Sequence, residues 1–84
     1  MRKQKLLQKL LSGTKNVRFS EALACAESFG FQLDRVNGGH HILIHPQIPE
    51  LLNLQDFKGK AKPYQIKQML QLIEIHNLRM GDEQ

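Results

Sequence analysis

Residues 30–46 read GFQLDRVNGGHHILIHP, and this stretch decides the fold. Residues 31–36 and 40–45 are two runs rich in apolar residues, which is typical of strands, and the Asn37-Gly38 pair between them favours a two-residue hairpin loop. With that loop Arg35 lies opposite His40, and one face of the hairpin holds the candidate core residues Phe31, Leu33, Ile42 and Ile44. A loop that also contains Gly39 leaves a poorer apolar face, so we predict the two-residue loop.

Helices are predicted on both sides of this hairpin. Ser20 is a good N-cap for a helix that has Glu21 in its first turn and ends at Gly30. Pro63 suits the first position of a later helix. The apolar stripe of that later helix, which we expect to be core, consists of Ile66, Met69, Leu70 and Ile73.

A third strand is predicted between the hairpin and the second helix. The two prolines of residues 46–49 predict a loop, and residues 51–57 follow as a strand with Leu52 and Leu54 on one side. The order α-β-β-β-α predicts an α+β fold in which a three-stranded antiparallel sheet has both helices on one face. We expect a single domain over residues 1–84, with a basic leader helix or arm over 1–15, a core over 16–78 and a polar tail over 79–84.

Length and composition exclude several classes of protein. A chain of 84 residues buries one small core and has no room for a cofactor domain beside a substrate domain. No apolar run approaches the roughly 18 residues that a membrane span needs, and we expect no membrane association. Cys25, the single cysteine, lies among alanines and is expected to be a core residue rather than a nucleophile. The lack of a disulfide framework favours an intracellular, cytoplasmic protein.

The positive charges are clustered along the chain. Residues 1–18 carry six basic residues and residues 58–67 carry four, and neither stretch contains an acid. Two unopposed basic blocks create a field suited to a phosphate backbone. The pattern therefore favours a nucleic-acid partner, although surface lysines that only keep a small protein soluble remain an alternative.

Three histidines lie within six residues, at positions 40, 41 and 45. On a strand His41 and His45 stand roughly 13 Å apart at about 3.3 Å per residue, so zinc–nitrogen bonds of about 2.1 Å cannot join them. We therefore expect no metal and no other cofactor. Imidazole titrates near neutrality, so His40, beside flexible glycines at a strand start, could take the proton of an RNA 2′-hydroxyl. Spacing alone leaves a simple surface role for His40 open.

The run from Gly30 to Pro46 resembles the signature of the HicA toxins, an aromatic residue after a glycine and then an R-x-x-G-x-H-H hairpin that ends in H-P. The resemblance covers residues 18–78 and implies a fold like the double-stranded-RNA-binding domain. It also implies cleavage of messenger RNA and neutralisation by a HicB-type antitoxin. The motif places the family's active histidine on His40 and its glycine on Gly38, and it assigns no role to His41 or His45. Residues 51–55 depart from the family, which has a histidine there.

We therefore predict a metal-independent endoribonuclease with His40 as general acid or base and Gly38 shaping the turn. The candidate RNA contacts are Gly38, Arg35, Lys58, Lys60 and Lys62. Two alternatives remain: a module that binds RNA without cutting it, and a protein-interaction module that docks an acidic partner. The open sheet face offers no aromatic platform in this reading, which argues against stacking of single-stranded bases.

Overall fold

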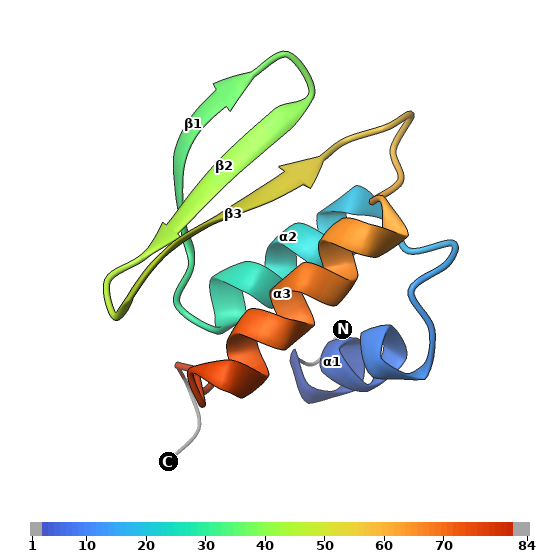
Figure 1. Cartoon of the computed structure of the whole chain (residues 1–84). Coiled ribbons are helices and arrows are strands. Elements are labelled where there is room, and N and C mark those ends of the chain that lie inside the picture. Colours follow the sequence, from blue (N-terminus) through green and yellow to red (C-terminus); the bar gives the residue numbers. More distant parts are fainter. Residues whose placement is uncertain (1–2, 82–84) are drawn as a thin grey trace.

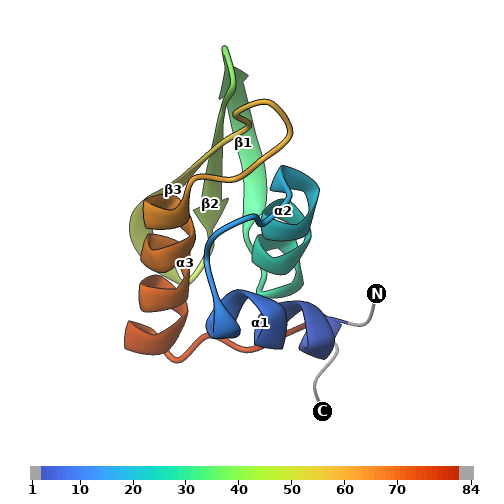
Figure 2. The ribbon, with the colours of Figure 1, turned by 90° about the vertical axis from the view of Figure 1, so that its right-hand side faces the viewer.

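A three-stranded sheet, a pair of helices beneath it and a third helix across that pair make up the computed structural model, which describes residues 3–81. The elements follow in the order α1 (Lys3–Ser12), α2 (Phe19–Ser28), β1 (Gln32–Asn37), β2 (His40–His45), β3 (Ile48–Gln55) and α3 (Pro63–Ile75). The strands are antiparallel in the order β1-β2-β3. Helices α2 and α3 cover one face, and α1 lies on the far side of that pair (Figures 1 and 2). The predicted α+β fold is confirmed.

The turn of the β1–β2 hairpin lies one residue later than predicted. Asn37 pairs with His40, so the loop residues are Gly38 and Gly39. Gly39 is held by the end of the third strand, because its carbonyl accepts the Asp56 N–H at 2.9 Å. A Cβ on Gly39 would lie 3.0 Å from the Asp56 carbonyl oxygen, so this close approach of two backbones favours a glycine.

The predicted core face of the hairpin is also wrong. Phe31 is buried as expected, but Leu33 is 48% exposed and Leu43, which we did not place in the core, is fully buried. Residues 42–44 are all apolar, so either face of β2 could have turned inward. A bulge in β1 directly after Leu33 brings Leu33 opposite Leu43 while the rest of the strand keeps the register of the turn.

The third strand begins earlier than predicted. Strand β3 starts at Ile48, and the loop before it shrinks to Pro46 and Gln47. Pro49 is tolerated inside β3 because this strand lies at the edge of the sheet, where a missing N–H need not break a ladder. Leu52 and Leu54 are fully buried on one side of the strand, as predicted.

The N-cap of α2 is Arg18 and not Ser20. Arg18 has extended backbone (φ −69°, ψ 144°) because it forms a β-bridge with Lys60, and its N–H donates to Glu21 Oε1 at 3.0 Å. A long-range backbone pairing therefore sets the start of the helix, two residues earlier than the local signal. The helix ends as predicted, since Gly30 takes the left-handed conformation (φ +96°) that stops a helix.

Two predictions about core side chains are confirmed. Helix α3 begins at Pro63, and its Ile66 and Met69 are fully buried. Cys25 is 1% exposed, and burial raises the pKa of its thiol to about 11, so it is a core residue and not a nucleophile.

Both ends of the described chain join the same core. Leu6 and Leu10 of α1 are buried, so the basic leader is a packed helix from Lys3 onward. Met80, which we placed in the polar tail, is 3% exposed, and this assignment is wrong. The N–H of Gly81 donates to the Ser28 carbonyl at 2.9 Å, while residues 82–84 lie outside the described part of the chain.

Glu21 clamps α1 to the start of α2, because its carboxylate also accepts a hydrogen bond from Lys9 Nζ at 2.7 Å. The Lys9 ammonium and then the Arg18 N–H lower the pKa of Glu21 from its ordinary 4.5. A lowered pKa means that the charged carboxylate stabilises the fold above pH 4.5 and that this contribution disappears as the pH falls through the folded-state pKa.

We expect Glu21→Gln to lower the free energy of unfolding by about 1 kcal/mol at pH 7 and by much less near pH 3. Urea denaturation followed by circular dichroism at both pH values measures the difference. Glu27→Gln, on an exposed position of the same helix, is the matched control. An equal loss at both pH values would show that the carboxylate charge is not responsible.

Candidate functional site

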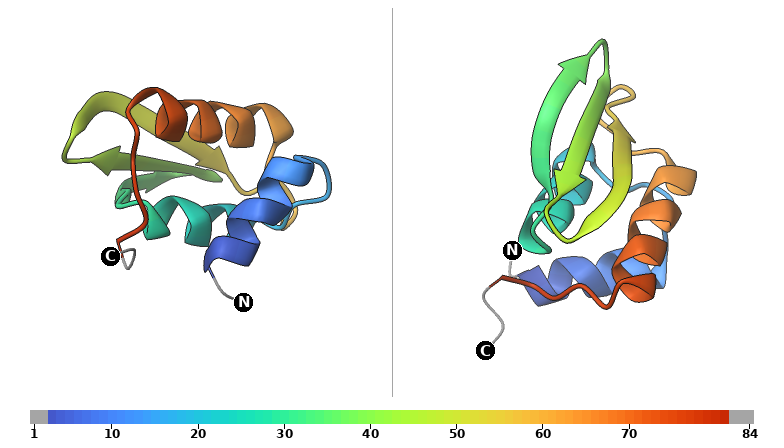
Figure 3. Two further views of the ribbon diagram at one scale, coloured as in Figure 1. Left: turned by 90° about the horizontal axis from the view of Figure 1, so that it is seen from below. Right: turned by 60° about the vertical axis from the view of Figure 1, so that its left-hand side comes forward.

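The three histidines of β2 lie on different faces of the sheet. In the register of the two hairpins His40 pairs with Asn37 and Gln55 on the face that carries no helix in the described structure (Figure 3, right). His41 and His45 alternate to the face that α2 and α3 cover. The three histidines of one motif therefore have different surroundings.

His40 is oriented by a hydrogen bond across the sheet. Its Nδ1 lies 3.2 Å from Oδ1 of Asn53 on β3. An amide oxygen only accepts, so Nδ1 carries the ring proton and the neutral ring keeps a lone pair on Nε2. The hydrogen bonds among the described residues leave Nε2 without a protein partner. His40 is half-buried, so this lone pair is held in place and still reachable from the open face.

His41 has a structural role. Its Nδ1 donates to the Gly39 carbonyl at 3.3 Å, and its ring packs on Phe19 at 4.5 Å between centroids. It thereby joins the hairpin turn to the start of α2. Its half-buried place between turn and helix leaves it without access to the open face.

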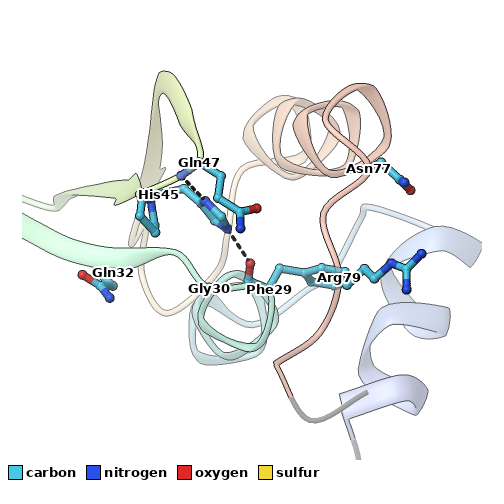
Figure 4. Close-up of a pocket in the computed structure, with 8 residues that line it drawn as sticks. Phe29, Gly30, Gln32, His45, Gln47, Asn77 and Arg79 are labelled. Carbon is cyan, nitrogen blue, oxygen red and sulfur yellow. Dashed lines mark hydrogen bonds between the residues drawn. The ribbon is translucent and has the colours of Figure 1, made fainter. Parts of the chain in front are cut away.

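His45 is also accounted for by packing. It is 8% exposed, its Nε2–H donates to the Phe29 carbonyl at 2.9 Å, and its Nδ1 accepts the Gln47 N–H at 3.1 Å (Figure 4). Beside it lies a surface pocket lined mainly by polar side chains, among them Arg79. With both nitrogens engaged in backbone bonds, His45 cannot move a proton to or from a ligand in that pocket.

The predicted partner of His40, Arg35, is not beside it. Arg35 pairs with Ile42, and its guanidinium donates to Asp34 at 2.6 Å in an exposed ion pair. The prediction that Arg35 lies opposite His40 is therefore wrong, and Asn37 takes that place. Gly38 lies in the turn with φ +63°, where glycine is the favoured residue, and an added Cβ would meet no atom within 4 Å.

The predicted lysines lie in a loop that backbone hydrogen bonds hold next to the hairpin turn. We call residues 57–62 the basic loop; it includes Lys58, Lys60 and Lys62. It follows Asp56, whose N–H binds the Gly39 carbonyl, and so it begins beside the residue that precedes His40. The bridge between Arg18 and Lys60 also brings the end of the first basic block against the second, which the sequence could not show.

Two helix starts add to the positive charge at this end of the molecule. Both α2 and α3 begin beside the basic loop, at the same end as the β1–β2 turn (Figure 1). The first turn of a helix carries partial positive charge and favours anions. Among residues 3–81 no three histidine, cysteine or acidic side chains gather as a metal site. The arrangement thus offers one oriented imidazole on a hairpin whose turn is bonded to the start of a basic loop.

Asn53 is the site residue that sequence reasoning missed. We noted only that residues 51–55 lack the family's histidine and gave that strand no part in the site. A signal was present, because Asn53 stands between Leu52 and Leu54 and must point to the opposite, open face. What the sequence did not contain is the register that brings it to His40.

A comparison with models of protein families shows which family this chain resembles. The model described as the HicA toxin of bacterial toxin–antitoxin systems matches residues 19–75. The chain belongs to the HicA toxin family. The members are toxins of toxin–antitoxin pairs and generally RNases, so an RNA-cleaving activity, an RNA substrate and an antitoxin partner follow at the level of the family. Among curated proteins no significant match was found.

The matched range has two consequences for this HicA-family chain. It contains α2, the whole sheet and α3, and so every residue of the site described above, whereas α1 lies outside it. Within residues 3–81 every helix is too short or too polar to cross a membrane.

The glycine and the last histidine of the HicA motif form one packing unit. A Cβ on Gly30 would lie 2.8 Å from His45 Nε2, and its backbone has φ +96°. We expect Gly30→Ala to lower the free energy of unfolding by about 2 kcal/mol or more, because a left-handed residue and the His45–Phe29 bond are both disturbed. Thermal unfolding measures this. Gly13→Ala, where no atom lies within 4 Å, is the control; equal stability of both variants would contradict the account.

Proposed function

We propose that this protein is a metal-independent endoribonuclease that cuts messenger RNA, with His40 Nε2 moving the proton. The observation that carries the proposal is the His40–Asn53 hydrogen bond, since it leaves the lone pair of an oriented imidazole on the open face of the sheet. A group poised in this way can accept a proton near neutral pH without a metal ion. Cutting transcripts would block translation, and we place this activity in the cytoplasm.

The reaction is an internal transfer on the RNA. His40 Nε2 takes the proton of a 2′-hydroxyl, and the 2′-oxygen attacks the adjacent phosphorus. The 2′-O–P bond forms, the P–O5′ bond breaks, and the departing 5′-oxygen receives a proton from the imidazolium or from water. The products are a 2′,3′-cyclic phosphate and a 5′-hydroxyl. Fixed positive charge lowers the barrier by stabilising the extra charge on the phosphoryl oxygens.

The basic loop and the hairpin turn are the parts of the protein that we propose to bind the phosphate. Lys58, Lys60 and Lys62 are proposed as phosphate contacts, because the loop that holds them is anchored to Gly39. The turn itself, with Gly38 at its tip, lets a backbone approach closely. Arg35 is a weaker candidate, since its ion pair with Asp34 must open before it can bind phosphate.

A HicB-type antitoxin is the proposed inhibitor. The open face that bears His40 also exposes Ile44 and Leu51 farther along the same strands, which gives a protein partner apolar surface on that face. A partner seated there would cover Nε2 and exclude RNA. The proposal therefore uses one surface for both catalysis and inhibition.

We expect His40→Ala to lower the rate of RNA cleavage in EDTA by about 10²–10⁴, because the proton acceptor is lost. Gel analysis of a labelled transcript measures the rate, and RNA binding should be retained. His76→Ala, which removes a half-buried histidine paired with Glu50, is the control. RNA that is bound but left intact by the unaltered protein would instead identify a binding module, and unchanged cleavage by His40→Ala would remove His40 from the mechanism.

Asn53 is proposed as a positioning residue that acts through His40. We expect Asn53→Ala to reduce the cleavage rate about tenfold, because the ring loses the bond that selects its tautomer. Asn53→Asp should restore the orientation and favour the protonated ring. Its rate should then rise with pH about one unit later than in the parent. A pH–rate profile of all three proteins makes the test, and identical profiles would show that Asn53 does not act on the imidazole.

A further inference from the structure

Phe57 is the most exposed phenylalanine of the described chain, with 52% of its surface accessible. A single exposed apolar residue says little by itself. Its setting is what distinguishes Phe57, because the ammonium groups of Lys58 and Lys62 lie 5.6 Å and 5.5 Å from its ring centroid. An aromatic face between two cations matches a ligand that offers flat rings and negative charge together.

The ring is held by a backbone that is already ordered. Phe57 and Lys60 exchange both backbone hydrogen bonds, at 2.9 Å and 3.0 Å, around a tight turn. The two central residues of the turn, Lys58 and Gly59, have φ of +53° and +83°. A lysine rarely adopts this conformation, and it persists only where the surroundings impose it. Here they do, since Gly59 is bound on both sides.

Two anchors keep Gly59 in place. Its N–H donates to Asp56 Oδ1 at 2.8 Å, and its carbonyl accepts the N–H of Phe19, the first residue of α2, at 2.9 Å. One residue pair further on, the Ala61 N–H donates to the Val17 carbonyl at 2.9 Å. A surface that is ordered in advance loses little conformational entropy when a ligand binds.

The position of Phe57 relative to the candidate catalytic group is defined by the sheet. Gln55 is the direct partner of His40 in β3, and Phe57 follows it by two residues. Asp56, between them, is bonded to the Gly39 carbonyl, so the basic loop starts where the His40 hairpin turns (Figure 2). A nucleic-acid strand that brings a phosphate to His40 and runs toward the hairpin turn would pass this loop.

We propose that Phe57 is a stacking site for an unpaired base of the RNA, next to the phosphate presented to His40. Lys58 and Lys62 move from the ring to the flanking phosphates. The inference rests on the proposed function and deepens it, since it names single-stranded RNA as the substrate class. In a duplex the bases are stacked on each other and cannot reach an aromatic side chain. The proposed stacking site lies on the basic loop. It does not lie on the open face of the sheet, where the sequence predicted no aromatic platform.

The experiment measures RNA affinity in a His40→Ala background, which keeps the RNA whole if the proposed function holds. The probes are a short mixed-sequence oligoribonucleotide and the duplex that it forms with its complement. Phe57→Leu should weaken single-strand binding about tenfold, since a stacked base is lost, and should change duplex binding less than about twofold. Phe57→Trp should restore single-strand affinity. Ile75→Ala, an exposed apolar residue at the opposite end of α3, should change neither.

Three results overturn the stacking site: unchanged single-strand affinity in Phe57→Leu, an equal loss for single strand and duplex, or a loss of antitoxin binding with RNA affinity intact. The last result assigns Phe57 to a protein interface. If the unaltered protein fails to cut RNA while Phe57→Leu still loses single-strand affinity, the nuclease proposal fails and the stacking site stands. The two proposals can therefore fail separately.

Discussion

The backbone hydrogen bond between Asp56 and Gly39 is the constraint on which the end of the molecule that carries the candidate site depends. It holds the end of β3 so close to the hairpin turn that a Cβ at position 39 would lie 3.0 Å from the Asp56 carbonyl oxygen. The turn position that results pairs His40 with Asn37. The same bond starts the basic loop, whose pairing with residues 17–19 sets where α2 begins. One backbone contact thus relates the imidazole, the lysines and two helix starts.

The three histidines have different roles because they lie on different faces of the sheet and have different hydrogen-bond partners. His41 and His45 donate to backbone carbonyls and pack on Phe19 and Phe31, so they take the inner face as polar members of the core. His40 meets a side-chain amide and keeps one nitrogen for other use. Both nitrogens of His45 are bonded inside the fold, so it has none to offer a substrate. His41 is separated from His40 by its place on the inner face, between the hairpin turn and α2.

A second polar contact holds the other side of the site in place. Gln65 of α3 is 2% exposed, and its Oε1 accepts the N–H of Gln55 at 2.7 Å. Gln55 is the sheet partner of His40, so the start of α3 is joined to the strand position beside the imidazole. Helix and sheet therefore share a rigid polar link where the chain leaves β3 for the basic loop.

The sequence by itself determined the order of the elements and the presence of the hairpin. It also determined that α2 stops at Gly30, that α3 begins at Pro63 and that Leu52 and Leu54 are buried. Helix caps, helix breakers and strand alternation are local signals, so the sequence alone reveals them. The motif also selected His40 as the candidate, ahead of any geometry.

Only the tertiary structure decided which face of β2 turned inward, because residues 42–44 are apolar on both faces and 37–39 allow two turns. Asp56, distant in sequence, bonds to the turn, Asn53 orients the ring of His40, and the face of β2 that carries Leu43 joins the core with α2 and α3. Short-range patterns cannot rank two registers that bury similar apolar surface, and long-range contacts can.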